Sequence, residues 1–313
     1  MGDEKTTRRD VMKLGVGAGI ALAMARLPRA MAGAREKPPM AKAIPSSGER
    51  LPVVGLGTNR FGETSPEALA ARRAVLVRLA ELGGKVVDTA PGYGQSEEVI
   101  GQLVAELGNR DKLWIATKVT SEGDAAEGTK MLEESLRRLH TDRLELVQVH
   151  NLTGWKVMLP VLREWKARKR IKYIGMTTSR EEQYEEMLQI MRSEPLDFIQ
   201  VNYAVGNRKA AEKILPLAAE RKMAVLVNMP FGGRRGPVLA ATKGKELPKW
   251  AAEYDASSFA QLFLKYVVSH PAVTAAIPGT TNVAHLEDNL RAARGRMPDA
   301  AGRKRIEKLF DGF

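Results

Sequence analysis

The strongest constraint on the fold is a repeated pair of patterns: a short apolar run of strand length, then a segment in which apolar residues recur at helical spacing. Eight such runs occur, and Val, Ile and Leu are prominent in them. Runs that are apolar throughout are typical of parallel strands buried on both faces. The expected strands cover 53–57, 85–88, 112–118, 144–150, 171–176, 197–202, 223–228 and 273–277.

A helical pattern follows each expected strand, over 66–82, 96–107, 128–140, 155–169, 180–192, 208–222, 257–269 and 283–293. Eight strand–helix units close into a barrel, and a single barrel of about 250 residues fits a chain of 313. An open doubly wound sheet is the alternative, but it usually has fewer strands and a Gly-rich turn after its first strand, which is missing here. The sequence therefore predicts the α/β class and a single (β/α)8 TIM barrel.

The first residues of the chain have the composition of an export signal. Residues 7–13 read TRRDVMK, a weakly apolar run follows, and small residues surround Ala32 and Ala34. This segment resembles the twin-arginine (Tat) signal, with Arg8 and Arg9 as the pair and Val11 where Phe is commonest. A chance Arg pair before an amphipathic helix is the alternative.

The resemblance implies that residues 1–34 are a Tat signal peptide, that the Tat translocase is a partner, and that the protein is periplasmic. Cleavage of the leader and its retention as a membrane anchor both remain open. Residues 35–47 are rich in Pro, Lys and Ala without an apolar period, which predicts a linker. The barrel domain is then expected over residues 48–313.

The charge and the missing cysteines exclude several classes of protein. The formal net charge is +12, and the densest basic cluster is the run KARKRIK over 166–172. A solvated helix end explains this cluster, because cations complement a helix C-terminus, and a phosphate-binding patch is the alternative. No nucleic-acid motif accompanies it, so no nucleic-acid partner is expected. There is no Cys and there are four His without ligand spacing, so disulfides are excluded and no metal is expected.

Polar residues at the ends of three consecutive strands predict an active site. Asp88 ends the second strand, Tyr93 follows it, Lys118 ends the third strand and His150 ends the fourth. Each has a structural explanation by itself, but the carboxyl ends of barrel strands meet at one mouth, where active sites form. A Lys charge beside a phenol favours the phenolate and so lowers the Tyr pKa, which suits a general acid for a carbonyl oxygen.

The motifs VVDTAPGYGQSEEVIG, LWIATKV, LELVQVHN, YIGMTTS, IQVNY and AAIPGTTNVAHLEDNL resemble the aldo-keto reductases, in order and along nearly the whole chain after the leader. The resemblance implies an NAD(P)-dependent oxidoreductase that interconverts a carbonyl and an alcohol by hydride transfer. It makes Tyr93 the proton donor, Lys118 its partner, Asp88 the residue that holds Lys118, and His150 the group that orients the carbonyl.

The same resemblance implies the cofactor residues. It places the carboxamide near Thr177, Thr178 and Gln200, although the family usually has Ser-Asn at the Thr pair. His285 stands where many members carry Arg, and Gly279 where many carry Lys. Family habit favours NADP, and NAD remains possible. The full set of implied cofactor residues is Thr58, Asn59, Asp88, Thr177, Thr178, Gln200, Pro230, Phe231, Gly232, Gly279, Thr280, Thr281, His285 and Asn289.

Two other functions remain open at this point. A catalytically silent exported barrel that binds a ligand or partner protein would suit a compartment poor in free nucleotide. A hydrolase or lyase could use Asp88 with Glu97 or Glu98. The chain stops soon after its last expected helix, so we expect an open pocket with little C-terminal lid and with Trp155 on its wall. The substrate is expected to be a small carbonyl or alcohol and the protein a monomer or weak oligomer.

Overall fold

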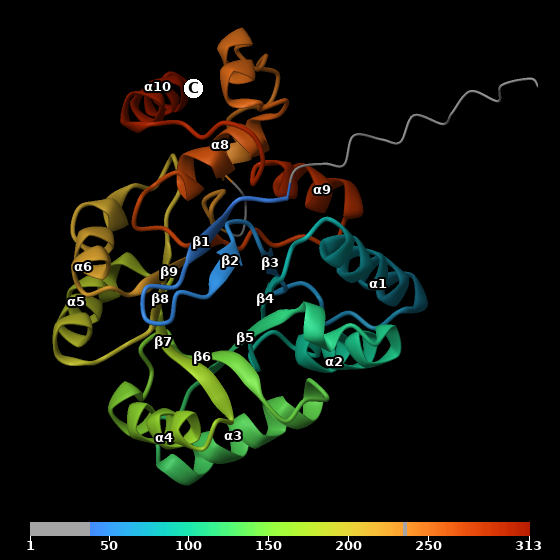
Figure 1. Cartoon of the computed structure of the whole chain (residues 1–313), viewed down its shortest axis with the longest axis vertical. Coiled ribbons are helices and arrows are strands. Elements are labelled where there is room, and N and C mark those ends of the chain that lie inside the picture. The colour runs from blue at the N-terminus through green and yellow to red at the C-terminus, as the bar shows by residue number, and fades with distance from the viewer. Residues whose placement is uncertain (1–37, 234–236) are drawn as a thin grey trace, which may run out of the picture. The chain divides into compact units, whose positions relative to one another are not determined.

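The computed structural model describes residues 38–233 and 237–313, and these residues contain one closed parallel barrel (Figure 1). Its eight strands are hydrogen-bonded in the order β10-β9-β8-β7-β6-β5-β4-β3. Parallel bridges from Val54 to Ala276 and from Gly57 to Gly279 join the first strand to the last. The prediction of a single (β/α)8 barrel is confirmed. The strands are β3 (Leu56–Gly57), β4 (Val86–Asp88), β5 (Trp114–Val119), β6 (Leu144–His150), β7 (Ile171–Thr177), β8 (Phe198–Asn202), β9 (Ala224–Asn228) and β10 (Ala275–Ala276).

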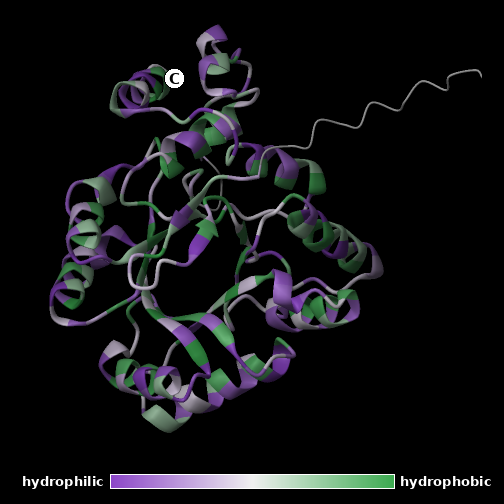
Figure 2. Cartoon of the chain, in the orientation of Figure 1, coloured by the Kyte–Doolittle hydropathy of each residue, from purple (hydrophilic) through white to green (hydrophobic). Residues whose placement is uncertain are grey.

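One principal helix follows each strand and packs outside the sheet (Figure 1). Side-chain caps set where several of them begin: Ser65 accepts a hydrogen bond from the Ala68 amide, and Asp124 accepts one from the Glu127 amide. Hydrophobic and hydrophilic residues are interleaved along these helices, as expected for one buried face (Figure 2). The helices are α1 (Pro66–Glu81), α2 (Ser96–Leu107), α3 (Ala125–Arg138), α4 (Trp155–Ala167), α5 (Tyr184–Ser193), α6 (Ile214–Glu220), α8 (Phe259–Val268) and α9 (Val283–Arg291).

The barrel interior changes from apolar to polar along the strands. Near the amino ends, Trp114, Tyr173 and Phe198 pack ring against ring with centroids 5.4–6.2 Å apart. Because side chains alternate along a strand, the inward positions further along are those of Lys118, Thr177 and other polar residues. The carboxyl end of the barrel is therefore the polar end.

The predicted linker is wrong in its second half. Residues 41–43 form β1 (Ala41–Ala43), which pairs in antiparallel fashion with β2 (Arg50–Pro52). Ile44 and Leu51 from this hairpin are fully buried in the same cluster as the aromatic residues of the barrel interior. The hairpin therefore closes the amino end of the barrel, and the folded domain begins before residue 48. The predicted signal peptide over 1–34 lies outside the described residues.

Lys42 fastens this hairpin to the C-terminal end of α8. Its Nζ donates to the carbonyl oxygens of Val268, His270 and Val273 at 2.7–2.8 Å. These carbonyls lie at and beyond the C-terminus of α8, where backbone acceptors have no partner within the helix. A cation here satisfies them and favours the helix dipole.

Helical structure continues beyond the last helix that the sequence predicted. The helix α10 (Ala300–Asp311) follows α9, begins at the capping residue Asp299 and buries Ile306. Between β9 and α8 the chain also forms the short helix α7 (Pro237–Ala240) and a 3₁₀ segment, Lys249–Tyr254. Within the described residues, no helix has both the length and the apolar character needed to cross a bilayer.

Candidate active site

A cavity of about 420 Å³ opens at the polar end of the barrel. Its walls come from the loops and strand ends that follow β3, β4, β6, β7, β8, β9 and β10, so distant parts of the sequence meet there. This is the end at which barrel enzymes carry their active sites. Among the predicted residues, the lining includes Thr58, Asn59, Asp88, Tyr93, His150, Thr177, Gln200, Pro230, Phe231 and Gly279.

Asp88 and Lys118 form a buried ion pair behind this cavity. Lys118 Nζ lies 2.7 Å from Asp88 Oδ2, and the two side chains are 1% and 3% exposed. Lys118 Nζ also donates to the carbonyl oxygen of Thr89 at 2.8 Å. Burial lowers the pKa of Lys118, but the charges of Asp88 and Tyr93 and the hydrogen bonds to them raise it above its usual value. Lys118 is therefore a fixed cation at neutral pH.

Tyr93 and His150 stand over this pair at the cavity. The Lys118 ammonium lies 4.9 Å from the centroid of the Tyr93 ring. The rings of Tyr93 and His150 meet edge to face, with centroids 6.2 Å apart. Ser96 holds the Tyr93 loop, since its hydroxyl donates to the Tyr93 and Thr58 carbonyl oxygens at 2.9 Å. The structure thus brings together all four residues that the sequence singled out.

His150 is uncharged at neutral pH. Burial, followed by the charges of Lys118 and Arg180, lowers the pKa of His150 to about 4. A neutral imidazole keeps one donor nitrogen and one acceptor nitrogen. Within the cavity it can therefore donate a hydrogen bond without carrying charge.

Folding stability should fall as pH falls below about 6.5. Burial and nearby cations lower the pKa values of both His150 and His270 from 6.5 to about 4. Between these values the unfolded chain binds protons that the folded chain does not, so the free energy of unfolding decreases with falling pH. Urea titrations at pH 7.5 and 5 measure this slope. His270→Asn, whose Oδ1 can still accept from the Ala272 amide as His270 Nδ1 does, should flatten it. An unchanged slope in this variant would contradict the burial of a neutral His270.

A polar layer surrounds the buried pair. Gln200 Nε2 donates to Asp88 Oδ1 at 2.8 Å, and Thr177 Oγ1 donates to Gln200 Oε1 at 3.1 Å. Asn228 ends β9 and lines the cavity, but the sequence analysis did not select it. Its Oδ1 is buried and has no hydrogen-bond partner within the described residues. The reasoning that selected Asp88 and His150, a polar residue at a strand end, would also have found Asn228.

Several predicted cofactor residues lie outside the cavity lining. The Thr178 hydroxyl donates to Gln183 Oε1 at 2.5 Å, and Thr178 is fully buried. Gly232 lines a neighbouring depression that shares Ser179 and Met229 with the cavity. The others precede or belong to α9, which begins beyond the lining residue Gly279; they are Thr280, Thr281, His285 and Asn289.

The residues proposed for a hydrolase or for a pocket wall point elsewhere. Glu97 is fully buried and accepts hydrogen bonds from Thr117 and Ser135, which accounts for its carboxylate without a catalytic role. Glu98 pairs with Arg138 at 3.0 Å. Trp155 Nε1 donates to Glu186 Oε1 at 3.1 Å, so the expectation that Trp155 lines the pocket is wrong.

Comparisons with known proteins point to one family. A model of the Aldo/keto reductase family matches residues 53–301. The methylglyoxal reductase YeaE of Escherichia coli is 30% identical over 260 residues, covering 79% of this chain and 88% of that protein. The aldo-keto reductase YhdN of Bacillus subtilis is 30% identical over 200 residues, covering 59% of this chain and 60% of that protein.

Solved structures extend the likeness to three dimensions. The aldo-keto reductase of Klebsiella pneumoniae, solved in complex with NADPH, superimposes with a TM-score of 0.69 at 25% identity, covering 84% of this chain and 92% of that one. The family match spans the barrel and the strand ends that carry Asp88, Lys118 and His150. The chain belongs to the aldo/keto reductase family.

Proposed function

We propose that this chain is an NADPH-dependent reductase of small carbonyl compounds, in which Tyr93 acts as the general acid. The observation that carries the proposal is the cavity at which Tyr93 and His150 meet above the buried Asp88–Lys118 pair. Two aldo-keto reductase structures from Klebsiella pneumoniae were solved, one with NADPH and one with NADP and acetate. The enzyme class and the use of NADP follow from family membership, and the roles of the side chains are the proposal.

The side chains divide the work of protonating the carbonyl oxygen. Bound nicotinamide supplies the hydride to the carbonyl carbon. Tyr93 donates its phenolic proton to the carbonyl oxygen, and Lys118 stabilises the phenolate that remains. Neutral His150 donates a hydrogen bond that orients the carbonyl and stabilises negative charge as it develops on oxygen. Asp88 holds the Lys118 ammonium in place through the 2.7 Å ion pair.

The polar layer fits a carboxamide. Asn228 Oδ1 is a buried acceptor with no partner among the described residues, and an amide N–H can satisfy it. Thr177 and Gln200 line the same side of the cavity and would position such a group. The Phe231 and Pro230 segment and Gly279 would lie along the rest of the dinucleotide. At the adenosine end, the exposed His285 provides the side chain for recognition of the phosphate that distinguishes NADP from NAD.

The test is a titration of the protein with NADPH and NADH, followed by a panel of small aldehydes and methylglyoxal. We expect saturable quenching of protein fluorescence, tighter binding of NADPH, and aldehyde-dependent loss of absorbance from the reduced nucleotide. A protein that binds neither nucleotide would instead be the silent barrel that binds another ligand or partner. If the protein binds NADPH but reduces none of the carbonyls, the cofactor site stands and the role of Tyr93 as general acid is wrong.

We also propose that residues 1–34 direct export to the periplasm through the Tat translocase. The support is the Arg8–Arg9 pair, the short apolar run and the small residues near Ala34. Replacing both arginines by lysine should leave the enzyme in the cytoplasmic fraction of a Tat-competent bacterium. Equal periplasmic activity from the Lys–Lys variant, or from the wild-type chain in a strain without the translocase, would exclude this route.

A further inference from the structure

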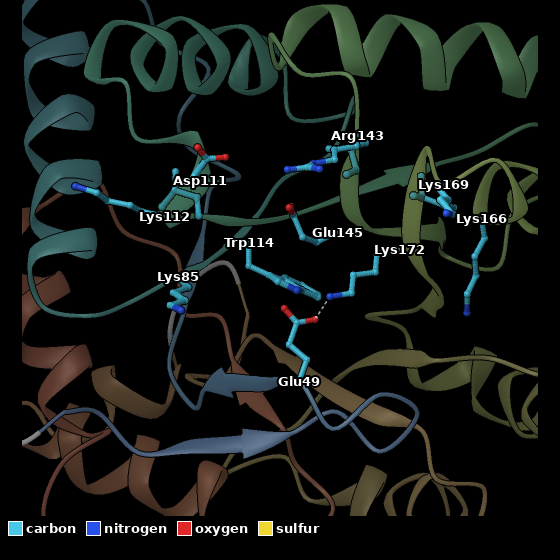
Figure 3. Close-up of a pocket in the computed structure, with 13 residues that line it drawn as sticks. Glu49, Lys85, Asp111, Lys112, Trp114, Arg143, Glu145, Lys166, Lys169 and Lys172 are labelled. Carbon is cyan, nitrogen blue, oxygen red and sulfur yellow. Dashed lines mark hydrogen bonds and ion pairs between the residues drawn. The ribbon is translucent and has the colours of Figure 1, made fainter.

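A second and larger cavity, of about 620 Å³, opens at the opposite end of the barrel, where the strands begin (Figure 3). It lies between the amino ends of β4, β5, β6 and β7 and the β1–β2 hairpin, which contributes Glu49. We call it the basal pocket. Its volume is in the range of small-molecule sites. None of its lining residues lines the active-site cavity.

The basal pocket is ringed by cations that arise at the same place in four successive units. Lys85 directly precedes β4, Lys112 precedes β5 by two residues, Arg143 directly precedes β6, and Lys169 precedes β7 by two residues. All four are exposed, and no ion pair or hydrogen bond of their side chains occurs within residues 38–233 and 237–313. The barrel geometry therefore gathers four unneutralised positive charges around one opening.

Two of the three carboxylates of the pocket are already paired, and the third, Asp111, is outnumbered by the four cations. Glu145 accepts from Arg110 at 2.9 Å and from the Ile115 amide at 2.7 Å, so it is already used. Glu49 is held by Lys172 at 2.8 Å (Figure 3), and it also accepts from the Tyr173 hydroxyl at 2.7 Å.

The positive charge of Lys85 contributes to lowering the pKa of Glu49, another residue of the pocket. Burial raises the pKa of Glu49, but the hydrogen bonds from Lys172 and Tyr173 and the charges of Lys172 and Lys85 lower it below its usual value. In all, six Lys or Arg line the pocket against three acids, an excess of three positive charges. Four cations held apart around a cavity suit a ligand with several negative charges better than a single carboxylate.

The floor of the pocket holds an unsatisfied donor as well. Trp114 begins β5, lines the pocket and is 3% exposed. Its indole Nε1 is buried without an acceptor in the described part of the chain. A helix end by itself does not explain the arrangement, since Lys85 and Arg143 lie four or more residues beyond the ends of α1 and α3.

We propose that the basal pocket is a binding site for a multiply charged phosphorylated anion. Phosphoryl oxygens carry the charge density that several separate Lys ammonium groups recognise as point charges, and the Arg143 guanidinium can bind two of them at once. The anion is a soluble phosphorylated metabolite or the headgroup of an anionic lipid, which share this chemistry. The site is separate from the carbonyl-reducing cavity, so it can be occupied together with the cofactor.

The test uses inorganic tripolyphosphate as the probe and the full chain saturated with NADP, so that the cofactor's own phosphate contacts are already filled. Calorimetric titration of the wild-type chain should give saturable binding that weakens as NaCl is raised, because salt screens exposed charges. The variant Lys85→Gln/Lys112→Gln/Arg143→Gln should bind about tenfold more weakly or worse. All three residues are exposed, and the rate of carbonyl reduction should be unchanged.

A matched variant, Lys130→Gln/Lys249→Gln/Lys304→Gln, removes the same charge from exposed sites outside the pocket and should bind tripolyphosphate like the wild type. Co-sedimentation with vesicles of phosphatidylglycerol and of neutral phosphatidylcholine identifies the source. If the wild-type chain sediments with the phosphatidylglycerol vesicles alone, and the Lys85→Gln/Lys112→Gln/Arg143→Gln variant does not, the ligand is the lipid headgroup. Binding of neither probe by the wild type, or equal weakening in both variants, would overturn the proposal.

Discussion

Replacing Tyr93 with phenylalanine is expected to lower kcat/KM for NADPH-dependent aldehyde reduction by about 10²–10⁴-fold, the usual contribution of a positioned general acid. The change removes only the phenolic hydroxyl. The ring contacts with Lys118, at 4.9 Å, and with His150, at 6.2 Å, are kept. The free energy of unfolding should therefore stay within about 0.5 kcal/mol of the wild type. Steady-state kinetics and urea unfolding measure the two quantities.

The matched control is Tyr254→Phe, which deletes the same atom from a buried tyrosine outside the cavity lining. Its kcat/KM should equal that of the wild type. NADPH should bind equally well to both variants, since the proton donor acts on the carbonyl oxygen. A Tyr93→Phe protein that keeps more than a tenth of the wild-type rate would assign the acid to another residue, and His150 would be the first to examine.

Replacing Asp88 with alanine should be the most destabilising of the changes considered. It leaves the Lys118 ammonium, 1% exposed, without its counter-charge. Breaking a buried ion pair from one side costs about 3–5 kcal/mol, which in a domain of this size corresponds to a fall in Tm on the order of 10 °C. It also leaves Gln200 without the Asp88 oxygen at 2.8 Å to which it donates. Activity should be lost together with stability.

The double variant Asp88→Asn/Lys118→Met separates these two effects. It removes both charges, keeps an oxygen that can accept from Gln200, and leaves no unpaired ion in the interior. We expect its Tm to recover most of the loss seen in Asp88→Ala, while carbonyl reduction stays absent because Tyr93 has no cation beside it. If Asp88→Ala unfolds at the wild-type temperature, the pair is not charged in the folded protein.

The barrel could be predicted because its signal is local. Each strand is a short apolar run, and each helix repeats its apolar face at fixed spacing, so neither needs knowledge of distant residues. The β1–β2 hairpin gave no such signal. Its strands have three residues each and are stabilised by Ile44 and Leu51 reaching into the barrel interior, which is a tertiary effect. By contrast, α10 was missed although Asp299 and Ile306 have the spacing of a capped amphipathic helix.

The site was predictable to the extent that strand ends determine it. Asp88, Lys118 and His150 could be placed at one mouth because parallel strands end at the same edge of a barrel. The position of Trp155 could not be predicted, because it depends on α5, whose Glu186 accepts its indole hydrogen bond. Thr178 shows a similar limit, since hydrogen bonding to Gln183 determines where its hydroxyl points.

The hydrogen bonds from Lys42 to the C-terminal end of α8 affect the order in which the barrel can close during synthesis. The hairpin that carries Lys42 is made before all eight barrel strands, whereas Val268, His270 and Val273, whose carbonyl oxygens accept from Lys42, are made after seven of them. The Met40 amide likewise donates a hydrogen bond to the carbonyl oxygen of Ala293. Until residues 268–293 have been made, the nascent chain therefore holds an unsealed barrel with an open sheet edge. The interval before these residues are made is when the barrel edge is most exposed to aggregation and to chaperones.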